Sequence, residues 1–256
     1  MGADEIKLAA AVIIFLVGLG GGAGAIRAEA KSAPDLFFAA GSVFAGGIFL
    51  GAGFIHLLPD AAGTFGTLFP ETSYPMAFLG AGLGFAVILL IDQFAHARAG
   101  QALSAESHGA TPYLVAVALS IHSILAGAAL GAEEHLVGSA VIFVAIIGHK
   151  GSAGFALAVS MMRGGLARAR AWRILILFSL MTPLGILIGV VGSWLLDDRG
   201  EEVFEAVFDA LAAGTFIYIA TVEIVAKEFR AERARALKLT LLLAGLGLMA
   251  MLAVWL

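Results

Sequence analysis

Eight long apolar stretches, separated by short polar segments, run along the chain. They cover about residues 6–26, 37–58, 76–95, 113–132, 138–162, 174–195, 204–226 and 237–256. Each has the length of about 20 residues that an α-helix needs to cross a bilayer core of about 30 Å. The alternation of apolar and polar positions that marks the strands of a transmembrane barrel is absent. We therefore predict an all-α integral membrane protein that forms a single transmembrane domain over residues 1–256.

The composition supports this class. Hydrophobic residues make up 61% of the chain and charged residues 13%, against about 45–50% and about 25% in soluble domains. The chain has no cysteine, which excludes disulfides and thiolate metal sites. Its net charge of −4 gives no indication of a nucleic-acid partner, so the lipid bilayer is the expected surrounding of the protein.

Basic residues are concentrated in every second loop. Most of the 15 lysines and arginines follow the first, third, fifth or seventh span: Arg27, Lys31, Arg98, Arg163, Arg168, Arg170, Arg173, Lys227, Arg230, Arg233, Arg235 and Lys238. Loops rich in lysine and arginine face the cytoplasm. We therefore expect a multi-pass protein of the plasma or inner membrane with both termini outside.

The second and seventh spans match each other without gaps, FAGGIFLGAGFIHLLPD (44–60) aligning with LAAGTFIYIATVEIVAK (211–227). The identical pairs are Ala45/Ala212, Gly47/Gly214 and Phe49/Phe216. The two spans cross the membrane in opposite directions, and inverted repeats are typical of transporters that bind substrate near the bilayer midplane. Identities among the small residues common in membrane helices also arise by chance. A true repeat predicts a 3+2+3 arrangement, in which the fourth and fifth spans lie between inverted outer repeats.

The fourth and fifth spans each carry a histidine near their centre. His122 and His149 lie about 15–18 Å from the start of their spans, at about 1.5 Å per residue. A polar side chain at that depth is costly in lipid and marks a functional site by default, so the pair indicates metal ligation or a proton relay. The alternative is a pair of neutral histidines satisfied by hydrogen bonds between helices. Ser123 either adds a hydroxyl ligand or bonds to its own backbone.

The sixth span contains a proline within FSLMTPLGILIG (178–189). Pro183 frees a backbone carbonyl and kinks the helix, and Ser179 and Thr182 can satisfy the freed group. The segment is either an opened turn beside the two histidines or an ordinary proline kink.

The remaining ionisable side chains of the spans lie toward the two faces of the membrane. His56, Asp60 and Asp209 lie at the outer side, and Asp92, His96 and Glu223 at the cytoplasmic side. Each alone is typical of an interfacial residue that reaches water. Together with the central histidines, these six side chains outline a polar pathway across the membrane.

Several segments resemble the motifs of one transporter family. HSILAGAALG (122–131) resembles the HSxxxGxxLG motif in the fourth helix of the ZIP (Zrt/Irt-like protein) family of divalent-metal transporters. Segments similar to the family's second, fifth, sixth and seventh helices occur in the same order: FAGGIFLGAGFIHLLPDA, HKGSAGFAL, FSLMTPLGILIG and AAGTFIYIATVEI. The resemblance covers the chain from the second span onward. It implies eight helices in a 3+2+3 arrangement, outward termini, a homodimer, and inward movement of Zn²⁺, Fe²⁺ or similar ions.

By position, the resemblance makes His122, Ser123 and His149 the metal-site residues, with no tightly bound cofactor besides the transported ion. Many family members carry a glutamate four residues after each histidine. Four residues advance an α-helix by about 400°, so both side chains share a face about 6 Å apart and can ligate one ion. Here those positions are Ala126 and Ala153, and Lys150 stands where other members place a second cation. The site therefore lacks the family's usual carboxylates.

Three functions are compatible with these features. We expect a transporter, not an enzyme, that moves zinc, or else iron or manganese, into the cytoplasm by alternating access about His122 and His149. Imidazole ligands favour such metals over Mg²⁺ or Ca²⁺. The alternative is a membrane-embedded metal-dependent hydrolase that uses these two histidines and His56, but a catalytic zinc needs three protein ligands and His56 is predicted near the outer face. A retinal-type photoreceptor is suggested only by Lys150, which lies on the fifth of eight helices rather than the last of seven.

Overall fold

The fold is a bundle of long helices. The computed structural model describes residues 3–31, 34–101, 111–133, 135–192, 198–230 and 232–254, and within these ranges every regular element is a helix. In the described part of the chain, eight stretches are long and apolar enough to cross a membrane: Ile6–Glu29, Asp35–Leu68, Met76–Phe94, Pro112–Ala132, Leu136–Arg163, Arg168–Gly192, Glu202–Glu228 and Arg235–Leu252. The predicted all-α membrane protein with eight spans is confirmed.

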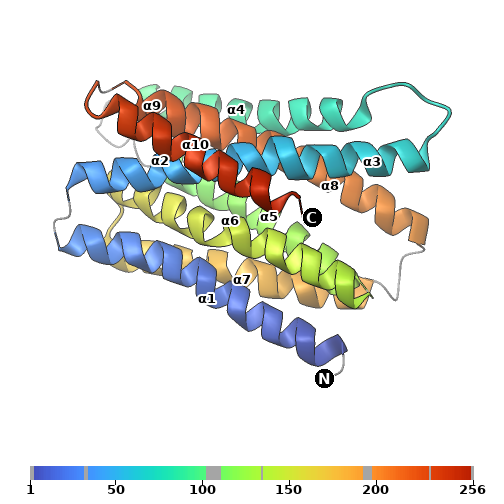
Figure 1. The fold of residues 1–256 in the computed structure, drawn as a ribbon. Helices are drawn as coiled ribbons and strands as arrows, with labels where there is room; N and C mark the ends of the chain where they lie inside the picture. The colour runs from blue at the N-terminus through green and yellow to red at the C-terminus, as the bar shows by residue number, and fades with distance from the viewer. Residues whose placement is uncertain are drawn as a thin grey trace.

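Two of the spans are built from several helical segments. The elements in chain order are α1 (Ala3–Ala30), α2 (Asp35–Gly51), η1 (Ala52–Leu57), α3 (Leu58–Leu68), α4 (Met76–Gln101), α5 (Thr111–Ala132), α6 (Leu136–Arg163), α7 (Arg168–Gly192), α8 (Asp198–Tyr218), η3 (Ile219–Val225), α9 (Ala226–Glu228) and α10 (Arg235–Leu252). The segments η1 and η3 are π-helical. Both termini lie toward the same end of the bundle, as an even number of spans requires (Figure 1).

The second span continues further than its sequence predicts. Its apolar pattern ends near residue 58 at Pro59, yet α3 carries the helix on to Leu68. A π-helical turn pairs each carbonyl with an N–H five residues on rather than four. Because η1 ends at Leu57 and Pro59 lies in the first turn of α3, the proline is tolerated there.

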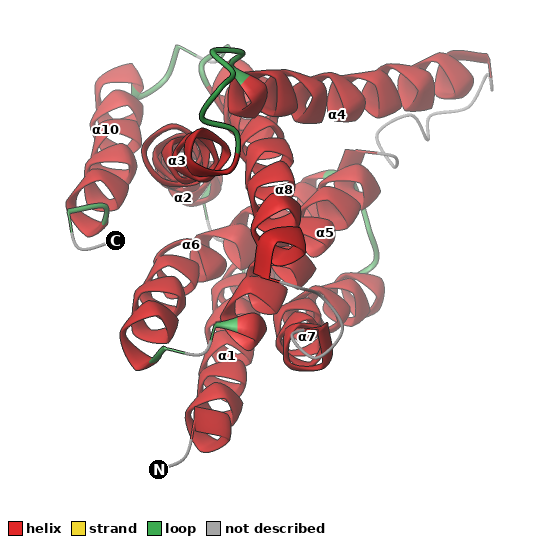
Figure 2. Ribbon diagram, turned by 90° about the vertical axis from the view of Figure 1, so that its right-hand side faces the viewer, coloured by secondary structure: helices red, strands yellow, loops and turns green. Residues whose placement is uncertain are grey.

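The helices pack in two groups. In one group α1 packs against α6 and α7, and α5 packs against α7. In the other group α2 packs against α10, and α4 packs against α8. Figure 2, in which α2 and α3 are seen end-on, places α10, α2, α3 and α4 on one side and α1, α6 and α7 on the other. The histidine-bearing helices α5 and α6 thus belong to the first group and face the second.

Close approaches at glycines occur in matching pairs. A Cβ on Gly47 would overlap the carbonyl oxygen of Leu242, and a Cβ on Gly245 would overlap that of Phe44. The α4–α8 contact repeats this pattern, because Gly214 meets the carbonyl of Ala81 and Gly84 meets that of Leu211. The sequence alignment of the second and seventh spans matches Gly47 with Gly214 and Phe44 with Leu211. These equivalent contacts support an inverted repeat, while the complete 3+2+3 arrangement stays a prediction.

The two π-helical segments also fall at matching positions. η1 begins at Ala52 and η3 at Ile219, which the same alignment pairs with each other. π-helical turns inside α-helices are uncommon and are often found at functional sites. Their shared position therefore supports the repeat and points to the part of the bundle that lies beside them.

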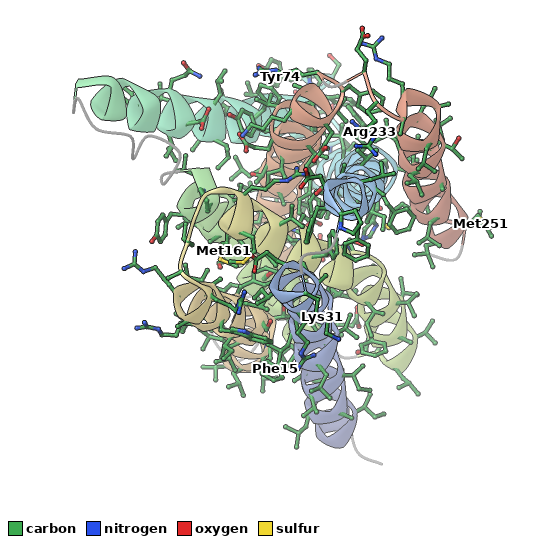
Figure 3. The ribbon with its side chains drawn as sticks, turned by 90° about the vertical axis from the view of Figure 1, so that its left-hand side faces the viewer. Phe15, Lys31, Tyr74, Met161, Arg233 and Met251 are labelled. Carbon is green, nitrogen blue, oxygen red and sulfur yellow. The ribbon has the colours of Figure 1, made fainter. Side chains whose placement is uncertain are left out.

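The outer faces of the helices carry large apolar side chains. Leu83 and Leu90 on α4, Leu187 on α7 and Met251 on α10 are each more than half exposed. Met251 projects away from the bundle in Figure 3. A surface of this kind would be unfavourable in water and suits contact with lipid chains.

Candidate metal centre

The two central histidines meet inside the bundle. His122 on α5 and His149 on α6 are both buried, their ring centroids are 5.3 Å apart, and their Nε2 atoms are 3.3 Å apart. They come together because both stand about midway along adjacent, antiparallel helices. The structure thus brings together the two side chains that the sequence singled out for metal binding.

The separation of the two Nε2 atoms suits a shared metal ion. Two nitrogens bound to one tetrahedral Zn²⁺ at about 2.0–2.1 Å lie about 3.3–3.4 Å apart, close to the 3.3 Å between His122 and His149. The same distance suits a hydrogen bond in which one Nε2–H donates to the other Nε2. Two of the predicted roles of the pair, metal ligation and a hydrogen bond between helices, are thus compatible with this geometry.

Lys150 crosses from α6 to the two helices beside it. Its Nζ donates to Ser123 Oγ at 2.9 Å and to Thr182 Oγ1 at 2.9 Å, with the carbonyl oxygen of Phe178 at 3.5 Å. The Phe178 ring lies 3.9 Å from the same nitrogen, in cation–π geometry. The lysine is 2% exposed, so these contacts replace the water that its amine would otherwise require. Ser123 and Thr182 are therefore occupied by Lys150.

The glycine contacts also relate the two halves of this site. A Cβ on Gly127 would overlap the Thr182 carbonyl, and a Cβ on Gly154 would overlap the Gly18 carbonyl. The two contacts are equivalent if α5 matches α6 and α7 matches α1. In that register His122 matches His149, and Lys150 matches Ser123. The two histidines thus occupy matching positions and make the site nearly symmetric. Lys150 breaks this symmetry, because its matching position holds a serine.

No carboxylate stands beside the histidines at the positions that the family motif would use. Ala153 is buried in the main apolar core, and Ala126 packs against a smaller cluster that includes Ile146 and Ile186. Among the described residues, no group of three or more histidine, cysteine, aspartate or glutamate side chains could hold a metal ion. The site therefore offers an ion two imidazoles and no carboxylate at these positions.

A phenylalanine covers the histidine pair from α8. The ring centroid of Phe216 lies 4.3 Å from that of His122 and 5.5 Å from that of His149. Phe216 in turn stacks on Phe49 of α2 at 5.0 Å, its partner in the predicted repeat. We did not identify either phenylalanine as a site residue from the sequence. The sequence feature that could have identified them is the presence of phenylalanine at both matched positions of the predicted repeat.

A cavity of about 450 Å³ lies at the end of the bundle that the basic loops predict to be cytoplasmic. Its lining includes Glu223, Lys227, Arg163 and Glu228. Lys227 Nζ lies 2.6 Å from Glu223 Oε2, and Arg163 forms an ion pair with Glu228. Both carboxylates of the cavity are thus neutralised by neighbouring cations.

Two of the three predicted cytoplasmic residues come together. Asp92 and Glu223 line a small space next to this cavity, together with Tyr218. Asp92 is buried although it lies near the end of its span. The side chain of His96 lies outside the described residues.

The predicted outer residues His56 and Asp60 contact each other. His56 Nδ1 forms a 2.6 Å ion pair with Asp60 Oδ2 one turn further along. Asp209 lies on α8, which packs against α3, the helix of Asp60. Because no three-ligand group occurs in the described part of the chain, the hydrolase that would use His56 with the two central histidines gains no support.

Comparison with known proteins finds a family whose members resemble this chain in sequence. A family model described as ZIP Zinc transporter matches residues 4–112 and 100–253. Bovine (Bos taurus) zinc transporter ZIP1 is 27% identical over 261 residues, covering 86% of this chain and 79% of the relative. Human (Homo sapiens) zinc transporter ZIP1 is also 27% identical, over 247 residues that cover 81% of this chain and 75% of the relative. A rice (Oryza sativa subsp. japonica) protein, zinc transporter 5, is 38% identical over 86 residues, covering 30% of this chain and 24% of the relative.

Proposed function

This chain belongs to the ZIP zinc transporter family, and on that premise we propose that it carries Zn²⁺ into the cytoplasm through a site formed by His122 and His149. Family membership makes it a metal-ion transporter and not an enzyme. The residues that bind the ion, the range of metals and the direction of movement are our proposal. Iron or manganese are the other candidate ions.

The geometry of the histidine pair carries this proposal. Two buried imidazoles on adjacent helices present their Nε2 atoms 3.3 Å apart, a separation that one tetrahedral zinc ion would accept at about 2.0–2.1 Å per bond. Near mid-bilayer, such groups are costly unless they serve a function. Ser123 is the candidate third ligand, and its hydroxyl would have to serve both the ion and Lys150.

Lys150 limits this site to one ion. Its amine lies among Ser123, Thr182 and the Phe178 carbonyl, where a second cation would otherwise find oxygen ligands. A positive charge on Lys150 would also weaken the hold on a divalent ion, because like charges repel strongly where water is excluded. We propose weak binding of one ion, which suits release rather than storage.

The proposed path continues to the cytoplasmic cavity. From the histidines the ion would pass Asp92 and Glu223, which share a small space beside that cavity. Glu223 would release Lys227 as it meets the ion. On the outer side His56, Asp60 and Asp209 would receive the ion first. The basic loops support an orientation with both termini outside. The family resemblance supports inward movement of the ion and a homodimer in the plasma or inner membrane.

Uptake into proteoliposomes tests this function. The purified full-length protein should accumulate radioactive Zn²⁺ inside the vesicles, whereas vesicles without protein should not. Uptake of Fe²⁺, Mn²⁺ and Co²⁺ under the same conditions would define the range of metals. If none of these ions enters above the background of empty vesicles, the proposed transport is wrong.

A further inference from the structure

The ring of Phe216 is the apolar wall of the histidine site. It contacts both imidazoles, at 4.3 Å from His122 and 5.5 Å from His149 between centroids. Phe216 is 0% exposed and the two histidines are 5% and 4% exposed. A metal ion bound to both Nε2 atoms would therefore have a hydrocarbon ring on one side, where it could hold no water.

Phe216 also packs against a second phenylalanine. Phe216 stacks on Phe49 with ring centroids 5.0 Å apart and an interplanar angle of 16°, and Phe49 is also fully buried. Among the described residues, Phe216 and not Phe49 makes the ring contacts with the histidines. Both rings are therefore part of the packed core, and of the two only Phe216 borders the histidines.

The lysine that follows His149 engages neighbouring hydroxyl groups. Ser123 and Thr182 accept hydrogen bonds from Lys150, whose ammonium would repel a cation that came closer. An ion between the two histidines is therefore left with few positions for additional oxygen ligands. The space suits a low coordination number.

Metal ions differ in how they tolerate this restriction. Zn²⁺ is commonly bound by four ligands in a tetrahedron, with nitrogen donors among them, whereas Mn²⁺ prefers six ligands, mostly oxygen. We propose that Phe216 is a specificity-determining residue, which favours four-coordinate Zn²⁺ over six-coordinate Mn²⁺ by denying the ion additional water ligands. This inference rests on the proposed function, because it requires that His122 and His149 bind the ion.

Cobalt reports the coordination number directly. Four-coordinate Co²⁺ absorbs visible light much more strongly than six-coordinate Co²⁺, so the purified full-length protein in detergent should show intense bands with Co²⁺. Phe216→Ala should weaken these bands and lower the preference for Zn²⁺ over Mn²⁺, measured by competition, by about tenfold, a contrast within the range that the shape of an apolar pocket provides. Phe216→Leu, which keeps an apolar side chain and is less disruptive to folding, should give an intermediate change.

Phe49→Ala is the matched control. It removes the same ring from the same stack but leaves Phe216 on the histidines, so the Co²⁺ bands and the preference for Zn²⁺ should stay as in the wild type. Wild-type bands typical of six-coordinate Co²⁺, or an unchanged preference in both Phe216 variants, would overturn the role of Phe216. Equal changes in Phe49→Ala and Phe216→Ala would overturn it too, since packing alone would then explain them. A wild-type protein that binds none of the three ions would instead reject the histidine site itself.

Discussion

Lys150 Nζ lies 2.9 Å from the hydroxyl of Thr182, so that one buried amine joins the fifth span to the sixth. In the register given by the glycine contacts, the residue that matches Thr182 is Gly18. A Cβ at Gly18 would lie 3.0 Å from Cε of Lys150. The absence of a side chain at Gly18 thus leaves room for the lysine, and the hydroxyl of Thr182 holds its end. This difference between two matching positions lets a lysine occupy one side of a nearly symmetric site.

Removing the charge of Lys150 should strengthen metal binding. Lys150→Met keeps most of the side-chain volume but removes a cation beside the histidines, and at an effective dielectric constant of about 20 this should tighten Zn²⁺ binding by at least about tenfold. The hydroxyls of Ser123 and Thr182 lose their donor, so the free energy of unfolding should fall by about 1–3 kcal/mol. Isothermal titration and thermal unfolding measure the two effects.

Lys238→Met is the control for that substitution. Lys238 is also a buried lysine, and its Nζ donates to the backbone oxygen of Glu228, near the cytoplasmic cavity rather than the histidines. Its loss should leave Zn²⁺ affinity unchanged. Equal affinities in wild type and Lys150→Met would mean that the lysine does not act on the ion.

Replacing either central histidine should remove most transport. His122→Ala and His149→Ala each leave a single imidazole, and Zn²⁺ uptake into proteoliposomes should fall by at least about 10–100-fold, as for the loss of a group that supports a metal. His135→Ala is the control, because His135 is exposed and pairs with Glu133. Wild-type uptake in both single variants, with normal expression, would locate the binding site elsewhere.

Restoring a carboxylate should also strengthen binding, but the two available positions differ. Ala126 is only half-buried, so Ala126→Glu should fold and raise Zn²⁺ affinity by about tenfold, because a carboxylate offsets the charge of the ion. Ala153 is 3% exposed in the main core, so Ala153→Glu should destabilise the metal-free protein by about 3–5 kcal/mol, the cost of an unpaired buried charge. Thermal shifts with and without Zn²⁺ measure both effects.

Ala126→Gln separates charge from shape in that experiment. The glutamine has the size of glutamate without its charge, so it should raise the affinity much less. If neither glutamate variant changes Zn²⁺ binding, positions 126 and 153 do not face the ion, and the positions taken over from the family motif are wrong for this chain.

The sequence predicted the spans and the central histidines because membrane burial leaves a strong pattern. A helix in lipid must be apolar over its whole length, so a histidine such as His122 is conspicuous within it. The role of Phe216 could not be predicted in this way, since an apolar ring among apolar residues has no distinctive pattern. The same holds for η1, because a π-helical turn depends on packing rather than on residue type. The partners of Lys150 are common residues, and only their positions in space identify them.

The carboxylate at the cytoplasmic exit should affect the rate of transport rather than binding. Glu223→Gln releases Lys227 from its 2.6 Å ion pair and leaves a cation unpaired on the predicted path. Zn²⁺ uptake should therefore slow by about tenfold, while equilibrium binding at the histidines stays the same.

Asp92→Asn should slow uptake in the same way, because Asp92 lines the same small space as Glu223. Uptake at the wild-type rate in the double variant would contradict a role for these residues in the path. Glu232→Gln, at an exposed ion pair with Arg235, is the control.

The inverted repeat predicts that substitutions at matching glycines lower the stability of the protein by similar amounts. A Cβ on Gly47 would overlap the carbonyl of Leu242 in the α2–α10 contact, and a Cβ on Gly214 would overlap the carbonyl of Ala81 in the α4–α8 contact. Gly47→Ala and Gly214→Ala should therefore each lower the free energy of unfolding by about 1–3 kcal/mol, the usual cost of overpacking, and by similar amounts. Gly82→Ala has nothing within 4 Å of its new Cβ and should stabilise the helix by about 0.5–1 kcal/mol. Denaturation of the three variants in the same detergent measures the differences. A large loss in Gly47→Ala with none in Gly214→Ala would show that the two contacts are not equivalent, because a repeat inherited by both halves must restrict both positions in the same way.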